Sequence, residues 1–427
     1  MKIPFAVPRF GRSRLARRAA AFGSVVLAST TLAACASGAP AAKASGPIPI
    51  GGLTSLTGPK APFGLGISQG MTAGIYAVNR AGGVLGQHLQ LFPATDGSDP
   101  VDATAPASKL IDITHVVAQV GEGGEMSQAT APLFAKARTP DFVPGGDTFY
   151  DNNTDKYVWR LTPSDSQLGV ALATYGVHRG YKTAVTLFVS DAVQQALKGV
   201  VVGAYKKLGG KMLGQINLQP DLTSYSSEVS QIIHLHPQVI FTEMDPGTAS
   251  VIFKDFEGLG GLTIPFIGTD DMIGSSMTAA IGVAAQRKWM TNVEGGLYNS
   301  PAVGTFNKAI SSTSHTAPLP NSSYGYDGVV LAALAMVAAN STNGPAINAA
   351  VPKVTKPGGT IVYNFAQGAK DLKAGKRITY IGASGPFSFN KYHNVFGPFI
   401  AVRVDPNGVQ YATQYTMTAT QLEKTTP

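Results

Sequence analysis

From residue 48 onward, short apolar segments alternate with stretches of helical periodicity, and this alternation restricts the possible folds more than any other feature. The expected strands are residues 48–53, 89–95, 116–120, 183–189, 238–242 and 264–268. The expected helices are residues 66–80, 101–113, 127–138, 192–208, 224–235 and 247–259. Strands that alternate with helices form parallel sheets covered on both faces. The sequence therefore predicts an α/β fold.

The alternation breaks at residues 141–165, where turn residues cluster, and a second series then begins. A chain of 427 residues is long for one compact core and has room for two lobes. Ligands of open α/β sheets bind beyond the carboxyl ends of the strands. We therefore expect two lobes that face each other across a cleft, with the functional residues directly after the strands.

The C-terminal part of the chain is less regular. Residues 269–325 are rich in Gly, Ser, Thr and Asn, and the order of their elements is not clear from the pattern. A helix is expected over residues 326–340. Two further strands, 399–404 and 410–416, are joined by Asp405-Pro406-Asn407-Gly408, a sequence typical of a turn.

The N-terminus has the layout of an export signal. Residues 1–18 are basic, and residues 19–34 form an apolar run that is too short to favour a membrane-spanning helix. The run ends in Leu32-Ala33-Ala34-Cys35, which resembles the lipobox of bacterial lipoproteins, and Cys35 is the single cysteine of the chain. The resemblance implies that residues 1–34 are a lipoprotein signal peptide. Cys35 would then carry a diacylglycerol thioether as the mature N-terminus.

A lipid anchor implies a location on the extracytoplasmic face of the cell membrane, because two acyl chains hold a protein firmly where one does not. Residues 35–47 are small and polar with two prolines, which is typical of a flexible linker. The alternative is a plain secretory signal with a cysteine near the cleavage site by chance. The pair Arg17-Arg18 leaves open whether export follows the general or the twin-arginine route.

The net charge of +8 comes mostly from this leader. Six basic residues and no acidic residue precede Cys35, so the rest of the chain carries only +2. A nearly neutral body offers no broad cationic surface, which argues against nucleic-acid binding.

The sequence contains no GxSxG, phosphate-binding-loop or HExxH motif. The seven histidines are dispersed, and the one close pair, His234 and His236, has no acidic neighbour in sequence. A lone cysteine cannot form a multi-thiolate metal site. We therefore expect a protein that is not an enzyme and that uses no cofactor and no metal.

Several motifs follow the predicted strands in a fixed order. They are Leu56-Thr57-Gly58-Pro59, Gly70, Asn79-Arg80-Ala81-Gly82-Gly83-Val84-Leu85-Gly86, Val120-Gly121, Trp159-Arg160-Leu161-Thr162-Pro163-Ser164-Asp165, Gly209-Gly210-Lys211, Gly268-Thr269-Asp270 and Tyr326-Asp327-Gly328. Through their order and spacing, residues 48–427 resemble the type I periplasmic binding proteins of branched-chain amino-acid ABC transporters. That class binds leucine, isoleucine and valine, and its relatives bind amides, urea and aromatic acids.

The resemblance implies two Rossmann-like lobes with parallel central sheets, joined by three crossovers and closing on the ligand like a hinged trap. Lobe 1 would comprise residues 48–165 and 297–384. Lobe 2 would comprise residues 166–296 and 385–427.

An amino-acid ligand needs N–H donors for its carboxylate, an acidic group for its ammonium and an apolar wall for its side chain. The resemblance places a carboxylate-binding loop at residues 121–128, with Met126 and Ser127, and a second loop at Gly145-Gly146-Asp147-Thr148. Glu125 would repel a ligand carboxylate if it pointed inward. Met126 and Asp147 depart from the small hydroxyl residues common in the family. The alternative for the first loop is an ordinary strand-to-helix loop with Ser127 as N-cap, and the alternative for the second loop is a surface turn.

Asp270 matches the acidic position that holds the ligand ammonium, although Asp270 or Asp271 could instead cap the next helix. Phe63 matches an aromatic position near the ligand side chain, with a core or exposed position as the alternative. Asp191 follows strand 183–189, at a place where the family often has a Tyr-Gly pair.

Two further candidates are Met244, at a frequent ring position of the family, and Tyr324, near another lining position. Because the rings usual near Asp191 and at Met244 are replaced, the ligand need not be leucine.

The first functional hypothesis is a solute-binding lipoprotein. It would capture an amino acid or a related small polar molecule and deliver it to the permease subunits of an ABC importer. The second is a ligand-sensing lipoprotein that signals to a membrane partner, and the third is an extracytoplasmic hydrolase. We expect a monomer. The ligand itself cannot be named from the sequence.

Overall fold

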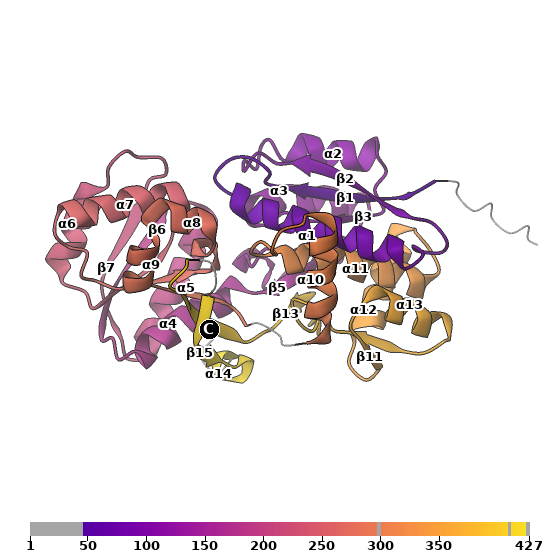
Figure 1. Ribbon diagram of the computed structural model, residues 1–427. Helices are drawn as coiled ribbons and strands as arrows, with labels where there is room; N and C mark the ends of the chain where they lie inside the picture. The colour runs from indigo at the N-terminus through magenta and orange to yellow at the C-terminus, as the bar shows by residue number, and fades with distance from the viewer. Residues whose placement is uncertain (1–45, 297–299, 409–410, 424–427) are drawn as a thin grey trace, which may run out of the picture. The chain divides into compact units, whose positions relative to one another are not determined.

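The computed structural model describes residues 46–296, 300–408 and 411–423. The predicted signal peptide and Cys35 lie outside these residues. The described chain forms two large sheets, each with helices on both faces, and a small sheet of two strands (Figure 1). The α/β fold predicted from the sequence is confirmed.

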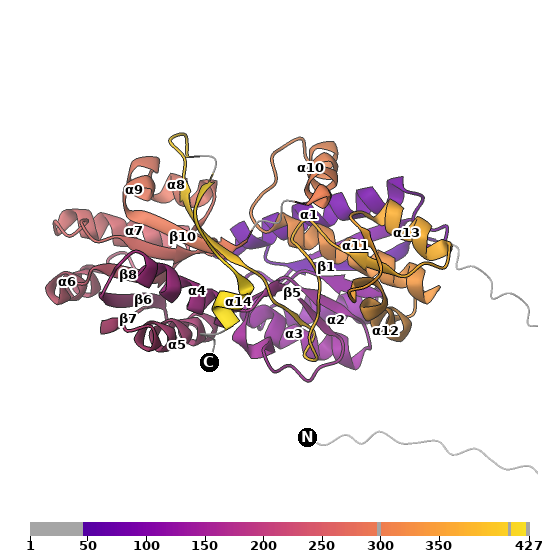
Figure 2. The same cartoon turned by 90° about the horizontal axis from the view of Figure 1, so that it is seen from below.

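The first sheet has six strands, and all its pairs are parallel. In spatial order the strands are β13 (Asn394–Val395), β5 (Val158–Pro163), β4 (Asp141–Val143), β3 (Ala118–Val120), β1 (Ile48–Thr54) and β2 (Leu89–Thr95). The helices that accompany this sheet are α1 (Ala61–Arg80), α2 (Thr104–Asp112), α3 (Gly124–Lys136), α10 (Pro301–Thr313), α11 (Ser322–Ala339), α12 (Gly344–Thr355) and α13 (Phe365–Lys373). The short 3-10 helix η1 (Thr148–Tyr150) and the small parallel sheet of β11 (Thr360–Val362) and β12 (Ile378–Tyr380) belong to the same part. We call this part the first lobe (Figure 2).

The second sheet has seven strands. In spatial order they are β15 (Tyr411–Met417), β14 (Phe399–Val404), β10 (Met290–Gly295), β9 (Phe266–Thr269), β8 (Val239–Glu243), β6 (Thr183–Val189) and β7 (Lys211–Leu218). The helices of this second lobe are α4 (Asp165–His178), α5 (Ala192–Lys207), α6 (Ser226–Leu235), α7 (Pro246–Gly258), η2 (Asp270–Met272), α8 (Ser275–Ile281), α9 (Val283–Trp289) and α14 (Ala419–Glu423). The strands from β7 to β10 pair in parallel, whereas β14 and β15 form the antiparallel hairpin expected from the turn sequence.

Strand β6 shows why the second sheet is covered on both faces. Successive side chains of a strand point to opposite faces. Ala184 and Phe188 pack in one apolar cluster with Leu197 of α5, while Val185 and Leu187 pack in another cluster on the opposite side. Because both faces are apolar, helices must cover both of them.

The chain passes between the two sheets three times: after β5, after β10 and after β13. The third crossing differs from the predicted boundary at residue 385. β13 pairs with β5, and Phe387 and Val395 pack in the core of the first lobe, so the chain leaves that lobe between Val395 and Phe399. The apolar side chains of residues 387–395 complete the core of the first lobe, and the local sequence pattern does not reveal which lobe they join.

The predicted break at residues 141–165 contains two real strands of the first sheet, β4 and β5. Both are short or flanked by turn residues, so their apolar pattern is weak. Strands β7 and β10 were also not predicted, because polar residues interrupt them. The eight predicted strands correspond to β1, β2, β3, β6, β8, β9, β14 and β15.

Glycines allow α1 and α11 to pack closely at the centre of the first lobe. A Cβ at Gly70 would collide with the carbonyl oxygen of Ser322, and one at Gly74 would lie 2.9 Å from Val329 Cβ. Helix α11 is long and apolar enough to cross a membrane by composition, but 72% of that segment is buried inside the protein. It therefore behaves as the core helix of the lobe.

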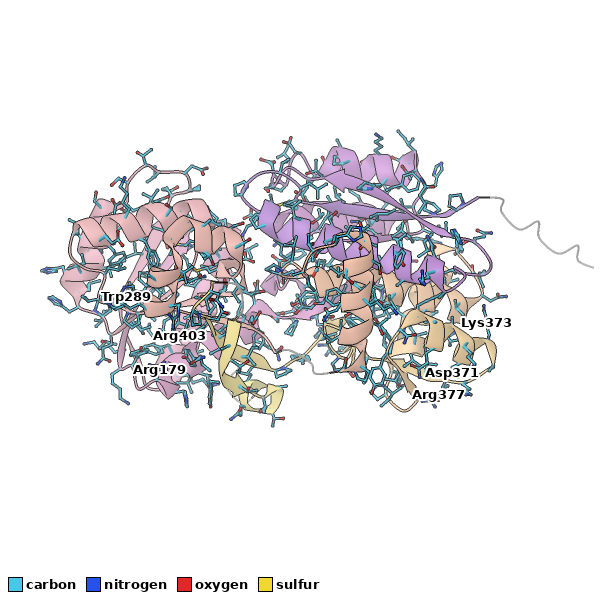
Figure 3. All side chains as sticks on the ribbon, viewed as in Figure 1. Arg179, Trp289, Asp371, Lys373, Arg377 and Arg403 are labelled. Carbon is cyan, nitrogen blue, oxygen red and sulfur yellow. The ribbon has the colours of Figure 1, made fainter. Side chains whose placement is uncertain are left out.

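Buried polar contacts hold the first crossover. Arg160 Nη1 donates to Asp151 Oδ1 at 2.8 Å, and Ser166 Oγ donates to Asp151 Oδ2 at 2.6 Å. In the second lobe, Arg403 of β14 donates from Nε to the carbonyl oxygen of Met290 at 3.1 Å, which ties the hairpin to β10 (Figure 3). The first contacts thus fix the crossover after β5, and the Arg403 contact fixes the far end of β14 against the start of β10.

Candidate functional site

A cavity lies where residues of both lobes meet, beyond the carboxyl ends of several strands. The first lobe contributes Lys60, Phe63, Gly123, Gly124, Met126, Pro144, Gly145, Gly146, Asp147 and Asn321 to its lining. The segment from β5 into α4 and the second lobe contribute Thr162, Pro163, Asp165, Leu168, Val193, Glu243, Asp270, Asp271, Gly295 and Phe399. This position is the one expected for a ligand of an open α/β sheet.

The loop from β3 into α3 supplies one wall. Gly121 and Gly124 have positive φ angles of 120° and 62°, which a side chain would disfavour, and Gly123 is the N-cap of α3. The free N–H groups at a helix N-terminus attract an anion. Here the anion is part of the chain itself, because Asp147 Oδ2 accepts a hydrogen bond from Gly124 N–H at 2.8 Å.

Gly145 and Gly146 make room for two carboxylates. A Cβ at Gly145 would lie 2.8 Å from Asp147 Oδ2, and one at Gly146 would collide with Asp165 Oδ1. Asp165 N–H also donates to the carbonyl oxygen of Gly146 at 2.6 Å. The two glycines therefore let Asp147 and Asp165 approach the same loop.

Glu243 ends β8, and Asp270 opens the 3-10 helix that follows β9. Burial raises the pKa of Glu243 to about 8, and the nearby Asp271 and Asp270 add to the shift. Burial and the charge of Asp271 likewise raise the pKa of Asp270 to about 7. The carboxyl groups of Glu243, Asp270 and Asp271 are therefore close enough to repel one another when ionised.

Two further carboxyl groups in the lining are Asp147 of the first lobe and Asp165 at the start of α4. Burial raises the pKa of Asp165 well above its usual range, and the charges of Asp147, Glu243 and Asp270 raise it further. Burial raises the pKa of Asp147 as well, although the hydrogen bond from Gly124 opposes this shift.

Among the described residues, Lys60 is the one cation in the lining of this cavity. Its Nζ lies 3.4 Å from Asp271 Oδ2, a contact between the two lobes. Burial lowers the pKa of Lys60, but the carboxylates of Asp271, Glu243 and Asp191 raise it by more, so the amine stays charged.

Apolar side chains complete the lining and come from both lobes. They are Phe63, Met126, Leu168, Val193 and Phe399, with Pro144 and Pro163 beside them. The cavity therefore combines apolar walls with several charged groups, a combination that suits a small amphiphilic solute.

Five of the candidate residues from the sequence line this cavity: Phe63, Met126, Gly145, Asp147 and Asp270. Two others line adjoining pockets, Met244 next to Glu243 and Tyr324 next to Glu294. Asp270 and Asn321 line all three pockets, so the pockets adjoin one another.

The other three candidates do not line these pockets. Ser127 is fully buried, donates to the carbonyl oxygen of Gly124 at 2.9 Å and accepts from Tyr150 Oη, so it is not the N-cap. Asp191 is the N-cap of α5, where its Oδ1 accepts from Gln194 N–H at 2.7 Å. Thr148 begins η1.

Glu125 does not point into the cavity lining. Its Oε1 accepts a hydrogen bond from Ala192 N–H, so it does not face a ligand carboxylate there.

Lys60 and Asp165 were not among the candidate site residues from the sequence. Glu243 directly follows the expected strand 238–242, where functional residues were expected, and Asp271 was named only as an alternative cap of the next helix. One sequence feature indicates Lys60 as a site residue: it follows Leu56-Thr57-Gly58-Pro59, the segment after β1. Asp165 and Glu243 also end or follow strands. Which of these side chains meet depends on how the two lobes face each other, and local pattern does not contain that information.

Among the described residues, no three His, Cys, Asp or Glu side chains form a group that could hold a metal ion.

Comparison with known proteins agrees with this geometry. The family model "Periplasmic binding protein" matches residues 47–409. An amino acid binding protein of Pseudomonas aeruginosa is 25% identical over 233 residues, which are 53% of this chain and 61% of that protein. A Leu/Ile/Val-binding protein homolog of Brucella abortus is 23% identical over 56% of this chain and 65% of its own length. The match thus spans less than two thirds of either relative.

The fold has a close counterpart among solved structures. The leucine binding protein LivK of Thermotoga maritima superposes with a TM-score of 0.73 at 19% identity, covering 87% of this chain and 99% of its own. The chain belongs to the periplasmic binding protein family, and its fold is that of the leucine binding protein, as the sequence motifs predicted.

Proposed function

We propose that this chain is an extracytoplasmic solute-binding lipoprotein that captures an amino acid or a related small polar molecule and delivers it to an ABC importer. The observation that carries the proposal is the cavity lined from both sheets, with Phe63 and Asp147 on one side and Glu243, Asp270 and Phe399 on the other. Membership of the periplasmic binding protein family supports it.

Capture would work by lobe closure. A solute that contacts both lobes favours the closed arrangement, and its higher affinity for that arrangement shifts the population. The three crossovers are the segments that would bend, and the contacts Lys60–Asp271 and Glu125–Ala192 are the kind of contact that closure would make.

The ligand class rests on the chemistry of the site and on relatives whose names refer to amino acids. Apolar walls with charged groups suit a small polar solute. In this proposal, the remaining site candidates support the binding site from near the pockets without lining the main cavity. They are Ser127, Thr148, Asp191, Met244 and Tyr324.

Solute binding and transport need separate measurements. Calorimetric titration of the purified chain with amino acids, amines, amides and aromatic acids should give saturable heat with at least one of them. Deleting the gene should then reduce cellular uptake of that solute. Normal uptake with a lost transcriptional response would instead support the sensor.

The lipid anchor is tested by Cys35→Ser. We expect the wild-type chain to incorporate radiolabelled palmitate and to remain with the membrane fraction, because diacylglycerol holds it there. The variant should lose the label and appear in the soluble fraction or medium. A variant that keeps the label would contradict anchoring through Cys35.

A further inference from the structure

The cavity contains more carboxyl groups than its own cation can pair with. Its lining, within the described residues, holds the carboxyl groups of Asp147, Asp165, Glu243, Asp270 and Asp271 against the amine of Lys60. Lys60 pairs with Asp271. Arg160 lies behind the loop, where it bonds to Asp151 and to the carbonyl oxygen of Asp147 rather than to a cavity carboxylate. The other four carboxyl groups therefore form no direct ion pair with a described residue.

Three of these carboxyl groups also lack hydrogen-bond donors from other residues. Within the described residues, the side chains of Asp165, Glu243 and Asp270 accept no hydrogen bond from another residue, and Glu243 is only 7% exposed. A buried carboxylate without a partner is unfavourable. A bound cation with N–H groups would supply both the missing charge and the missing donors.

Asp147 provides an independent sign of a ligand. The residue is 1% exposed and lines the cavity, yet its Oδ1 has no hydrogen-bond partner within the described part of the chain. Its other oxygen is fixed by Gly124 N–H. One oxygen of this buried side chain is thus held in place without a hydrogen-bond partner from another described residue.

The same contact removes a position that a ligand carboxylate would use. The N-terminus of α3 is the anion-attracting point of this wall, and Asp147 already occupies it. A second carboxylate beside Asp147 would be repelled by it. The wall therefore disfavours a solute that is held by its own carboxylate.

The origin of the acidic groups and the apolar part of the cavity lining indicate the remaining chemistry of the ligand. The acidic groups come from different elements, Asp147 after β4, Asp165 at the start of α4 and Glu243 at the end of β8. The same lining contains apolar side chains such as Phe63 and Leu168. Acidic groups from separate elements in a partly apolar lining match a solute that carries separate nitrogen groups on a carbon chain.

We propose that the solute captured here is an aliphatic cation with at least two nitrogen groups and no carboxylate, such as a diamine or a guanidino amine. This inference rests on the proposed solute-binding function and specifies its ligand. Asp147 Oδ1 would accept from one nitrogen group, and Glu243 with Asp270 from another.

Matched pairs of probes test the role of the carboxylate. Cadaverine is lysine without its carboxylate, and agmatine is arginine without it. Calorimetric titration of the purified full chain should show saturable binding of at least one of the two amines. That amine should bind about ten-fold or more tightly than its parent amino acid, because the carboxylate would lie against Asp147.

Charge-removing variants locate the bound cation. Asp147→Asn keeps an oxygen that can accept from Gly124 N–H, so the loop can stay in place while the negative charge is lost. We expect about ten-fold weaker amine binding and a smaller difference between amine and amino acid. Glu243→Gln serves as a second variant if Asp147→Asn does not fold. Glu257→Gln, an exposed site on α7, removes the same charge away from the cavity and should leave affinity unchanged.

The outcomes separate this inference from the function on which it rests. If leucine, another amino acid or an aromatic acid binds while the amines do not, or if lysine binds more tightly than cadaverine, the cationic ligand is wrong and solute capture stands. If amines bind equally well to Asp147→Asn and Glu243→Gln, the cation does not sit in this cavity. If no solute of the panel binds, both the inference and the proposed function fail.

Discussion

The Glu125 carboxylate at the start of α3 accepts a hydrogen bond from Ala192 N–H, 2.9 Å away at the start of α5. The two residues belong to different lobes. An anion at a helix N-terminus is stabilised by the free N–H groups and by the helix dipole. This contact therefore favours the arrangement in which the lobes meet around the cavity.

We expect Glu125→Gln to weaken solute affinity about two- to five-fold, equivalent to about 0.5–1 kcal/mol for a carboxylate at an exposed helix N-terminus. The amide keeps an oxygen acceptor but loses the charge. Titration calorimetry on the wild type and the variant gives the ratio. Equal affinities would mean that this contact does not belong to the solute-bound form.

Lys60→Met distinguishes two roles for the only amine in the cavity lining. If the ligand is a cation, removing Lys60 removes a repulsion and leaves Asp271 free, so amine affinity should stay equal or rise. If Lys60 instead binds a ligand carboxylate, affinity should fall about ten-fold or more. A fall of that size would contradict the cationic ligand.

Affinity for an amine should increase with pH. Asp270 and Glu243 have pKa values of about 7 and about 8, because burial and the neighbouring carboxylates favour their protonated forms, while Lys60 stays charged. A cation binds the ionised forms, so binding releases protons. We expect about ten-fold tighter binding at pH 8.5 than at pH 6. The profile should flatten in Glu243→Gln, and a flat wild-type profile would contradict the account.

The stability of the ligand-free chain should change in the opposite direction. The unfolded chain releases these protons near the ordinary carboxyl pKa of about 4, whereas the folded chain holds them up to about 7 and about 8. The contribution of these groups to stability is therefore greatest at low pH and is lost as pH rises through those values. Urea unfolding of Glu243→Gln should depend less on pH than that of the wild type.

Two glycine substitutions test the packing of the first lobe. Gly70→Ala should destabilise the protein by about 3 kcal/mol or more, because the new Cβ meets the carbonyl oxygen of Ser322 on α11. Gly203→Ala on α5 meets nothing within 4 Å and should stabilise by about 0.5–1 kcal/mol. Urea unfolding checks both. A neutral Gly70→Ala would show that α1 can move away from α11.

The sequence predicted the fold class because strand β6 and its neighbours are continuous apolar runs that only a sheet covered on both faces can bury. It failed for β4 and β10, which are short or partly polar and owe their place to neighbouring strands. The third crossover was misplaced for a similar reason. Val395 joins β5 from far along the chain, and such a pairing has no local signal.

The site was predicted in part. Asp147 and Asp270 could be found because parallel strands end at one edge, so the residues that follow them meet. The hydrogen bond from Gly124 N–H to Asp147 could not be predicted, because it depends on how two loops approach each other. The direction of the Ser127 side chain could not be predicted either: its hydroxyl donates to the carbonyl oxygen of Gly124 and accepts from Tyr150, and no pattern of residue types gives that direction.

A crystal structure with the most tightly bound solute tests the central claim most directly. We predict a nitrogen group of the solute within hydrogen-bond distance of Asp147 Oδ1 and a second one near Glu243 or Asp270. A carboxylate of the solute at Gly124 N–H, with Asp147 displaced from it, would contradict the account, and so would a solute bound outside the cavity between the lobes.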